Sequence, residues 1–120
     1  GERVIWRERV PQEAMPALYN LARVLVLPSF YEGFGLPVLE GMACGTVPII
    51  SNRSSLPEVA GDVGLQIEPE DLYTLVAALE RALTDDTWLH EQQQMALAQA
   101  AKFTWRHTAE VTLATYQTLL

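Results

Sequence analysis

The chain has 120 residues, which is enough for one domain with a modest hydrophobic core. Hydrophobic residues make up 49% and charged residues 19%, as in ordinary globular proteins, and no apolar run approaches the roughly 20 residues that a membrane-spanning helix needs. The formal net charge of −7 argues against nucleic acid and anionic membrane surfaces as partners. The single cysteine, Cys44, cannot form an intrachain disulfide. We expect it to be a small buried apolar residue rather than a nucleophile, in a protein of the reducing cytoplasm.

Residues 3–6, which include the apolar residues Val4, Ile5 and Trp6, are typical of a short strand. A helix is predicted over residues 12–22, because apolar residues recur there at helical spacing. Its buried stripe would be Met15, Leu18, Tyr19 and Ala22. Arg23 then places a positive charge where this helix ends, which favours the negative end of the helix dipole.

The centre of the chain predicts a strand, a loop, a helix, a turn and a second strand. Residues 24–27 and 47–50 are aliphatic and β-branched runs, typical of buried parallel strands. Pro37 suits the first turn of a helix because its missing N–H would have no partner there. The apolar side of this helix is expected to consist of Leu36, Val38, Leu39, Met42 and Ala43, with the last two in the core. Gly45 is expected to be the left-handed residue that follows it.

Two acids, Glu32 in the loop and Glu40 in the helix, enclose the glycines Gly33 and Gly35. Glycine lets a loop backbone approach a ligand closely, and a helix start presents N–H groups carrying roughly half a positive charge. The N–H groups of residues 35–38, apart from Pro37, therefore predict a phosphate site. Glu40 and Glu32 could accept hydrogen bonds from sugar hydroxyls. Their plain alternatives are a helix acid that favours the dipole and a solvated loop acid.

The second half predicts one more strand and several helices. Residues 51–55 follow a strand end, and Ser54 is expected to be the N-cap of a short helix. A strand is predicted over residues 64–67, followed by a helix that begins at residues 68–71. Asp85 and Asp86 are expected to break and re-cap the chain before a second helix over residues 88–103, and Thr104 to cap a last one. The first of these helices has an apolar stripe of Leu72, Leu75, Val76, Leu79 and Leu83. The second is expected to bury Leu89, Met95 or Ala96, Ala100 and Phe103. His90 and His107 have no ligand cluster near them, so no metal site is predicted.

The segment EGFGLPVLE, from Glu32 to Glu40, resembles the Glu-x7-Glu signature of retaining glycosyltransferases of family 4, which have the GT-B fold. The flanking PS and GMACGTVPIIS extend the resemblance. IWRERVPQEAMPALYNLARVLVLPS upstream and SSLPEVAGDVGLQIEPED and FTWRHTAEVTLATY downstream continue it over nearly all 120 residues. The fold expected is therefore α/β. Residues 1–120 would form part of the second, nucleotide-sugar-binding domain, a Rossmann-like parallel sheet with flanking helices and C-terminal helices.

The resemblance implies a cytoplasmic enzyme that transfers a sugar from a nucleotide-sugar donor with retention of configuration and without a metal or other cofactor. It implies donor-binding roles for Glu32, Gly33, Phe34, Gly35, Leu36 and Glu40, and for the backbone of Val10 at the rim of the base pocket. Glu32 is the predicted catalytic residue. The acceptor, the sugar and the base stay open, and no partner in the membrane or among nucleic acids is expected. The chain would hold only half of a donor site, so we expect weak nucleoside diphosphate binding and no sugar transfer by it alone.

In the family's strand order the strands near Leu25, Ile49 and Leu65 are neighbours, whereas residues 3–6 lie beyond two strands that this chain lacks. The chain begins without methionine, which suggests a piece of a longer protein. An unpaired first strand and an uncovered last helix predict self-association. Two alternatives stay open, namely a non-catalytic nucleotide-sugar-binding or scaffolding domain and a dinucleotide-binding module. The second ranks last, because no Gly-x-Gly-x-x-Gly follows a strand.

Overall fold

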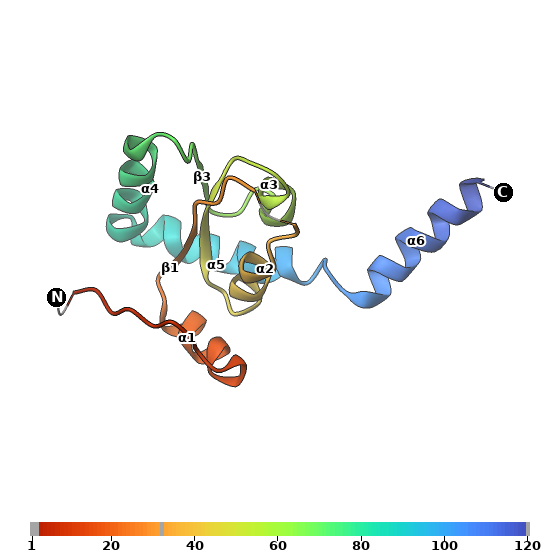
Figure 1. The fold of residues 1–120 in the computed structure, drawn as a ribbon, viewed down its shortest axis with the longest axis horizontal. Coiled ribbons are helices and arrows are strands. Elements are labelled where there is room, and N and C mark those ends of the chain that lie inside the picture. The colour runs from red at the N-terminus through yellow and green to blue at the C-terminus, as the bar shows by residue number, and fades with distance from the viewer. Residues whose placement is uncertain (1–2, 32, 120) are drawn as a thin grey trace.

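The computed structural model describes residues 3–31 and 33–119, which form a parallel sheet flanked by helices (Figure 1). The side chains of Trp105 and Thr108 are not described. A 3-10 turn covers Gln12–Ala14. The strands are β1 (Val24–Leu27), β2 (Val47–Ser51) and β3 (Leu65–Ile67). The helices are α1 (Met15–Leu21), α2 (Leu36–Ala43), α3 (Leu56–Ala60), α4 (Leu72–Thr84), α5 (Asp86–Ala100) and α6 (Trp105–Leu119). None of the described helices is long and apolar enough to span a membrane.

The three strands are parallel and lie in the order β1-β2-β3, so the predicted neighbours are confirmed. Val24 is paired with Val47, and Ile49 with Leu65. The middle strand β2 is buried along its whole length, as its continuous apolar run predicts. The chain enters β3 at Gly64, where φ is +73° and an added Cβ would lie 1.8 Å from the carbonyl oxygen of Pro48. Only glycine fits so close to the neighbouring strand.

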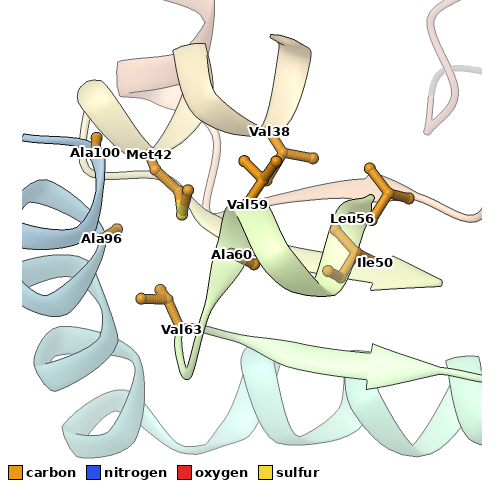
Figure 2. Packing of buried hydrophobic residues seen from close by; sticks show 9 residues of the cluster. All are labelled: Val38, Met42, Ile50, Leu56, Val59, Ala60, Val63, Ala96 and Ala100. Atoms are coloured by element: carbon orange, nitrogen blue, oxygen red, sulfur yellow. The ribbon is translucent and has the colours of Figure 1, made fainter. Parts of the chain in front are cut away.

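One face of the sheet is covered by α2, α3 and part of α5. Figure 2 shows side chains of these helices gathered around Met42 and Ile50, with Ala96 and Ala100 of α5 on the side of Met42. The small alanines let α5 approach α2 closely. The buried cluster consists of Val38, Met42, Ile50, Leu56, Val59, Ala60, Val63, Ala96 and Ala100. Ala43, which we placed in the core, is exposed, because this face of α2 turns away from the cluster.

The opposite face is covered by α4. Its buried residues are Ala78 and Ala82, which pack with Ile49 and Ile67 of the sheet, while Leu75 and Leu79 are partly buried beside them. The predicted stripe is therefore wrong for Leu72, Val76 and Leu83, which are exposed. The helix turns its alanines toward the sheet, since small side chains allow close contact, and these three residues of the stripe stay outside.

The predicted polar starts of the later helices are confirmed. Asp71 accepts a hydrogen bond from the Tyr73 N–H (3.0 Å), Asp85 accepts one from the Trp88 N–H (3.0 Å), and Thr104 accepts one from the His107 N–H (3.0 Å). Each bond satisfies an N–H that the helix itself leaves without a partner.

Ser54 is not the N-cap of α3, contrary to the prediction. The capping position is Ser55, and α3 begins at Leu56. Ser54 instead adopts a left-handed backbone conformation with φ +58°, which is unusual for a residue with a side chain.

Arg23 does not cap the helix that precedes it. Its Nε donates to the carbonyl oxygen of Ala82 (2.7 Å), and its guanidinium also pairs with Asp86. The positive charge therefore serves the carboxyl end of α4 and the start of α5, where both the helix carbonyls and an aspartate favour it. In α1, Tyr19 is buried as predicted, whereas Leu18 is exposed because α1 packs on α2 along a narrow contact.

Residues 3–6 do not form the predicted strand. No described strand pairs with them, and Val4, Ile5 and Trp6 are 76%, 72% and 83% exposed. An apolar run becomes a strand only beside a hydrogen-bonding partner.

At the C-terminal end of the chain, α6 extends away from the sheet (Figure 1), and every side chain described in it is exposed. Its exposed apolar residues include Val111, Leu113, Tyr116 and Leu119, as the expectation of an uncovered last helix requires.

Candidate functional site

The candidate site lies where β1 and β2 end. Parallel strands bring the segments that follow them to the same edge of the sheet, and ligands of open α/β sheets bind at this edge. Two hydroxyl groups join the two segments. Ser51, fully buried at the end of β2, donates to the carbonyl of Ser29. Ser55 donates a long hydrogen bond (3.3 Å) to the carbonyl of Gly33. The loop before α2 is therefore held by the end of β2 and by the segment that follows it.

Gly35 is the N-cap of α2 and has a left-handed φ of +84°. An added Cβ would lie 2.7 Å from Cδ2 of the buried Leu56, so this position needs glycine for two reasons. The carbonyl oxygen of Gly35 accepts from the N–H groups of Val38 (3.0 Å) and Leu39 (3.2 Å). The N–H of Val38 is therefore occupied, contrary to the prediction.

The N–H groups of Gly35 and Leu36 remain as the open donors at this helix start. Neither makes a hydrogen bond to another described residue. Nearby, a Cβ added at Gly33 would meet no described atom within 4 Å. Packing therefore gives no reason for glycine at this position, whereas the approach of a ligand would.

Phe34 lies between these glycines, and its ring contacts another ring rather than solvent alone. The ring centroids of Phe34 and Phe103 are 6.1 Å apart and the planes meet at 79°, an edge-to-face arrangement. Phe103 follows α5, which ends at Ala100 rather than at residue 103 as predicted. Nothing in the local sequence of Phe103 predicts contact with this loop.

Glu40 is half-buried on α2 and lines a hollow of about 260 Å³ between α1 and α2. The other lining residues are Gln12, Met15, Pro16, Tyr19, Ala43 and Cys44. Burial raises the pKa of the Tyr19 phenol, and the negative charge of Glu40 raises it further. The Glu40 carboxylate therefore lies near a phenol that keeps its proton at neutral pH and can donate it in a hydrogen bond.

The remaining predicted residues divide into those near this hollow and those outside it. Val10 is half-buried and lies just before the 3-10 turn of Gln12–Ala14, whose first residue lines the hollow. Leu36 is exposed at the start of α2. Glu32, the predicted catalytic residue, lies outside the described residues, so its role and its orientation toward Glu40 stay predictions.

Cys44 is half-buried rather than fully buried, because it borders this hollow at the end of α2. His90 and His107 are both exposed. Among the described residues, no group of three or more His, Cys, Asp or Glu side chains is arranged to hold a metal ion. Gln12 and Tyr19 were not predicted as lining residues, since their place depends on how α1 packs on α2.

Comparison with known proteins links the sequence of this chain to a family. The family described as glycosyl transferases group 1 matches residues 1–103. The O-antigen chain mannosyltransferase B of Escherichia coli is 46% identical over 110 residues, covering 92% of this chain and 29% of its own length. The MMP alpha-(1->4)-mannosyltransferase of Mycolicibacterium hassiacum is 37% identical over 109 residues, covering 88% of this chain and 26% of its own length.

A solved structure agrees with these relatives. Sucrose-phosphate synthase from Thermosynechococcus elongatus superimposes with a TM-score of 0.85 at 33% identity, covering 99% of this chain and 31% of the synthase. The chain thus spans less than a third of the proteins that it matches. Its parallel sheet with flanking helices is that of part of a GT-B glycosyltransferase domain, as the resemblance implied. Sequence and fold together show that the chain belongs to the family of glycosyl transferases group 1.

Proposed function

We propose that the full-length protein is a cytoplasmic enzyme that transfers a sugar from a nucleotide-sugar donor to an acceptor with retention of configuration. This chain would supply part of the donor site. Membership of the glycosyltransferase family supports the reaction class. The chain spans 29% of one mannosyltransferase and 31% of the synthase, so the acceptor site and the rest of the donor site would come from other parts of the protein.

One observation carries the assignment of the donor site: the N–H groups of Gly35 and Leu36 have no acceptor among the described residues and stand where α2 begins. As the bond from the sugar to the diphosphate breaks, negative charge grows on the departing diphosphate. Fixed N–H donors at the positive end of a helix stabilise this charge without having to reorganise. The open space at Gly33 would admit the donor to this position.

Glu40 would hold hydroxyl groups of the donor from the hollow between α1 and α2. A carboxylate accepts hydrogen bonds from two hydroxyls at once, and Glu40 stands one turn inside the helix that begins after Gly35. The backbone at Val10 would border the base, and the backbone of Phe34 would contact the diphosphate or sugar. Glu32 would act on the sugar at the mouth of the site. We propose that the transfer requires neither a metal ion nor another cofactor.

A mannosyl group is the first sugar to test. Several relatives are named mannosyltransferases, among them the O-antigen chain mannosyltransferase B and the serotype-specific mannosyltransferase WbdA of Escherichia coli, the latter 45% identical over 104 residues. A panel of UDP-, GDP- and ADP-sugars, including GDP-mannose, would be screened on the full-length protein by thermal shift and turnover.

The decisive variant is Glu40→Gln in the full-length protein. Loss of a charged acceptor for donor hydroxyls should weaken donor affinity by about ten- to a hundredfold. Glu58→Gln, on the exposed side of α3, is the matched control and should leave affinity unchanged. An unchanged affinity in Glu40→Gln would contradict the donor site. Donor binding without turnover under any condition would instead favour the non-catalytic alternative.

A further inference from the structure

The loop that leads into α2 is contacted by a ring from a distant part of the chain. Phe34 is 44% exposed, and its ring meets that of Phe103 edge to face, with centroids 6.1 Å apart. This separation lies within the range in which aromatic pairs attract one another beyond the burial of their surface. Phe103 is therefore a candidate for fixing the position of the loop.

Phe103 is itself held in place by the end of α5. Its N–H donates to the carbonyl of Ala100 (3.1 Å), and the preceding Lys102 donates to Gln99 (3.1 Å), so the chain closes a turn here. Ala100 belongs to the buried cluster that contains Met42 of α2 (Figure 2). Phe103 and α2 are therefore both anchored to the same buried cluster. Because the ring of Phe103 also contacts Phe34, it fixes the position of the loop relative to α2, the helix that follows the loop.

The loop is also contacted from the start of α3. Ser55 binds the Gly33 carbonyl through a long hydrogen bond, and Leu56 limits the space beside Gly35. Both residues come from the start of α3. The contact with Phe103 approaches from α5 instead, so the loop is held from two different helices.

We propose that Phe103 is a positioning residue, which holds the loop around Phe34 so that the N–H groups of Gly35 and Leu36 face the donor diphosphate. The inference rests on the proposed function for the identity of the ligand, but the ordering of the loop by Phe103 does not. An aromatic pair of this kind corresponds to about a two- to tenfold change in an equilibrium constant. A loop that is correctly placed for a smaller fraction of the time lowers donor affinity by the factor by which that fraction falls, and this factor is at most the change in the equilibrium constant.

The test compares Phe103→Leu and Phe103→Tyr in the full-length protein. The control is Tyr73→Leu, which removes an exposed ring on α4, far from the loop in sequence. Hydrogen exchange is measured on the peptide that covers residues 33–40, where the N–H groups of Val38 and Leu39 are protected by the Gly35 carbonyl. Exchange there should quicken about two- to tenfold in Phe103→Leu, and should stay at the original rate in Phe103→Tyr and in the control.

Binding of GDP and UDP is measured in parallel, with the KM and kcat for the donor that the screen identifies. The dissociation constant and KM should rise in Phe103→Leu, by up to about tenfold, with little change in kcat, and Phe34→Leu should abolish the further effect of Phe103→Leu. Unchanged exchange in Phe103→Leu would overturn the proposal whether or not the protein binds a donor. Faster exchange with unchanged donor affinity would overturn the positioning role. If no donor binds even to the original protein, the proposed function fails, and the exchange result still decides whether Phe103 orders the loop.

Discussion

Gly64 offers the sharpest test of how the sheet is assembled. In Gly64→Ala the new Cβ would lie 1.8 Å from the carbonyl oxygen and 2.9 Å from the carbonyl carbon of Pro48. A carbon and a carbonyl oxygen ordinarily approach to about 3.3 Å. The start of β3 would therefore have to move by about 1.5 Å, at the pair of Ile49 and Leu65, where β3 joins β2.

The expected loss of stability has two parts. Alanine at a left-handed φ of +73° costs about 1 kcal/mol. Displacement of a buried backbone contact and of the packing around Ile67 should raise the total to about 3–5 kcal/mol, in the range of severe core substitutions. That is a large share of the roughly 5–15 kcal/mol that typically stabilises a domain.

Gly45→Ala is the matched control, because Gly45 has a similar φ of +80°, as its predicted place after α2 requires, and its nearest neighbours are Leu97 atoms at 3.8 Å. This variant should lose only about 1 kcal/mol. Urea unfolding followed by circular dichroism gives both free energies of unfolding. Equal losses in the two variants would refute the close approach of β3 to β2.

Four further predictions follow, three of them from single residues and their contacts. Ser54→Gly should be about 1 kcal/mol more stable than Ser54→Ala in urea unfolding, since both lack the hydroxyl but only glycine adopts φ +58° freely; equal stability would contradict the strain. Asp85→Ala should lower the free energy of unfolding by about 1 kcal/mol in the same assay, because the Trp88 N–H in the first turn of α5 loses its acceptor. Asp85→Asn should retain most of this stability, since its amide oxygen can still accept; an equal loss in the two variants would contradict the cap. The hydrogen bond from Arg53 lowers the pKa of Glu68, so this pair stabilises the fold above the ordinary carboxyl pKa and the contribution is lost as pH falls through the lowered value. In Arg53→Gln, NMR titration should show the Glu68 pKa rising toward its ordinary value, and an unchanged titration would contradict the pairing. The 120-residue chain by itself should self-associate through the exposed apolar residues of α6 and bind nucleoside diphosphates only weakly; light scattering from a clean monomer would contradict the first expectation.

The parts of the fold that could be predicted are those that local sequence determines. β1 was predicted with its observed bounds, because a run of four aliphatic residues between Arg23 and Pro28 has few other structures open to it. The caps of α4 and α5 were predicted because Asp71 and Asp85 can accept the N–H groups that a helix start leaves open. The resemblance to glycosyltransferases supplied the neighbours in the sheet, which no local pattern contains.

Several of the errors share one cause, which is the choice of partner in three dimensions. Helical spacing predicts that α4 has an apolar stripe, but it does not decide whether its large side chains or its alanines meet the sheet, and Ala78 and Ala82 meet it. Arg23 stood beside the end of α1, yet its partners lie on α4 and α5. Residues 3–6 have the composition of a strand, but none of the described strands pairs with them. The contact of Phe34 with Phe103 likewise depends on how α5 packs on α2.

The two contacts of the Arg23 guanidinium have a consequence for chimaeras, in which helices are exchanged between related proteins. One planar guanidinium joins the start of β1 to the carboxyl end of α4 and to Asp86 at the first turn of α5. Lysine carries the charge as a single point and cannot reproduce both contacts in this geometry. A chimaera that takes α4 and α5 from a homologue would therefore keep both contacts only under two conditions. The recipient must have arginine at position 23, and the homologue must have a carboxylate at the position of Asp86.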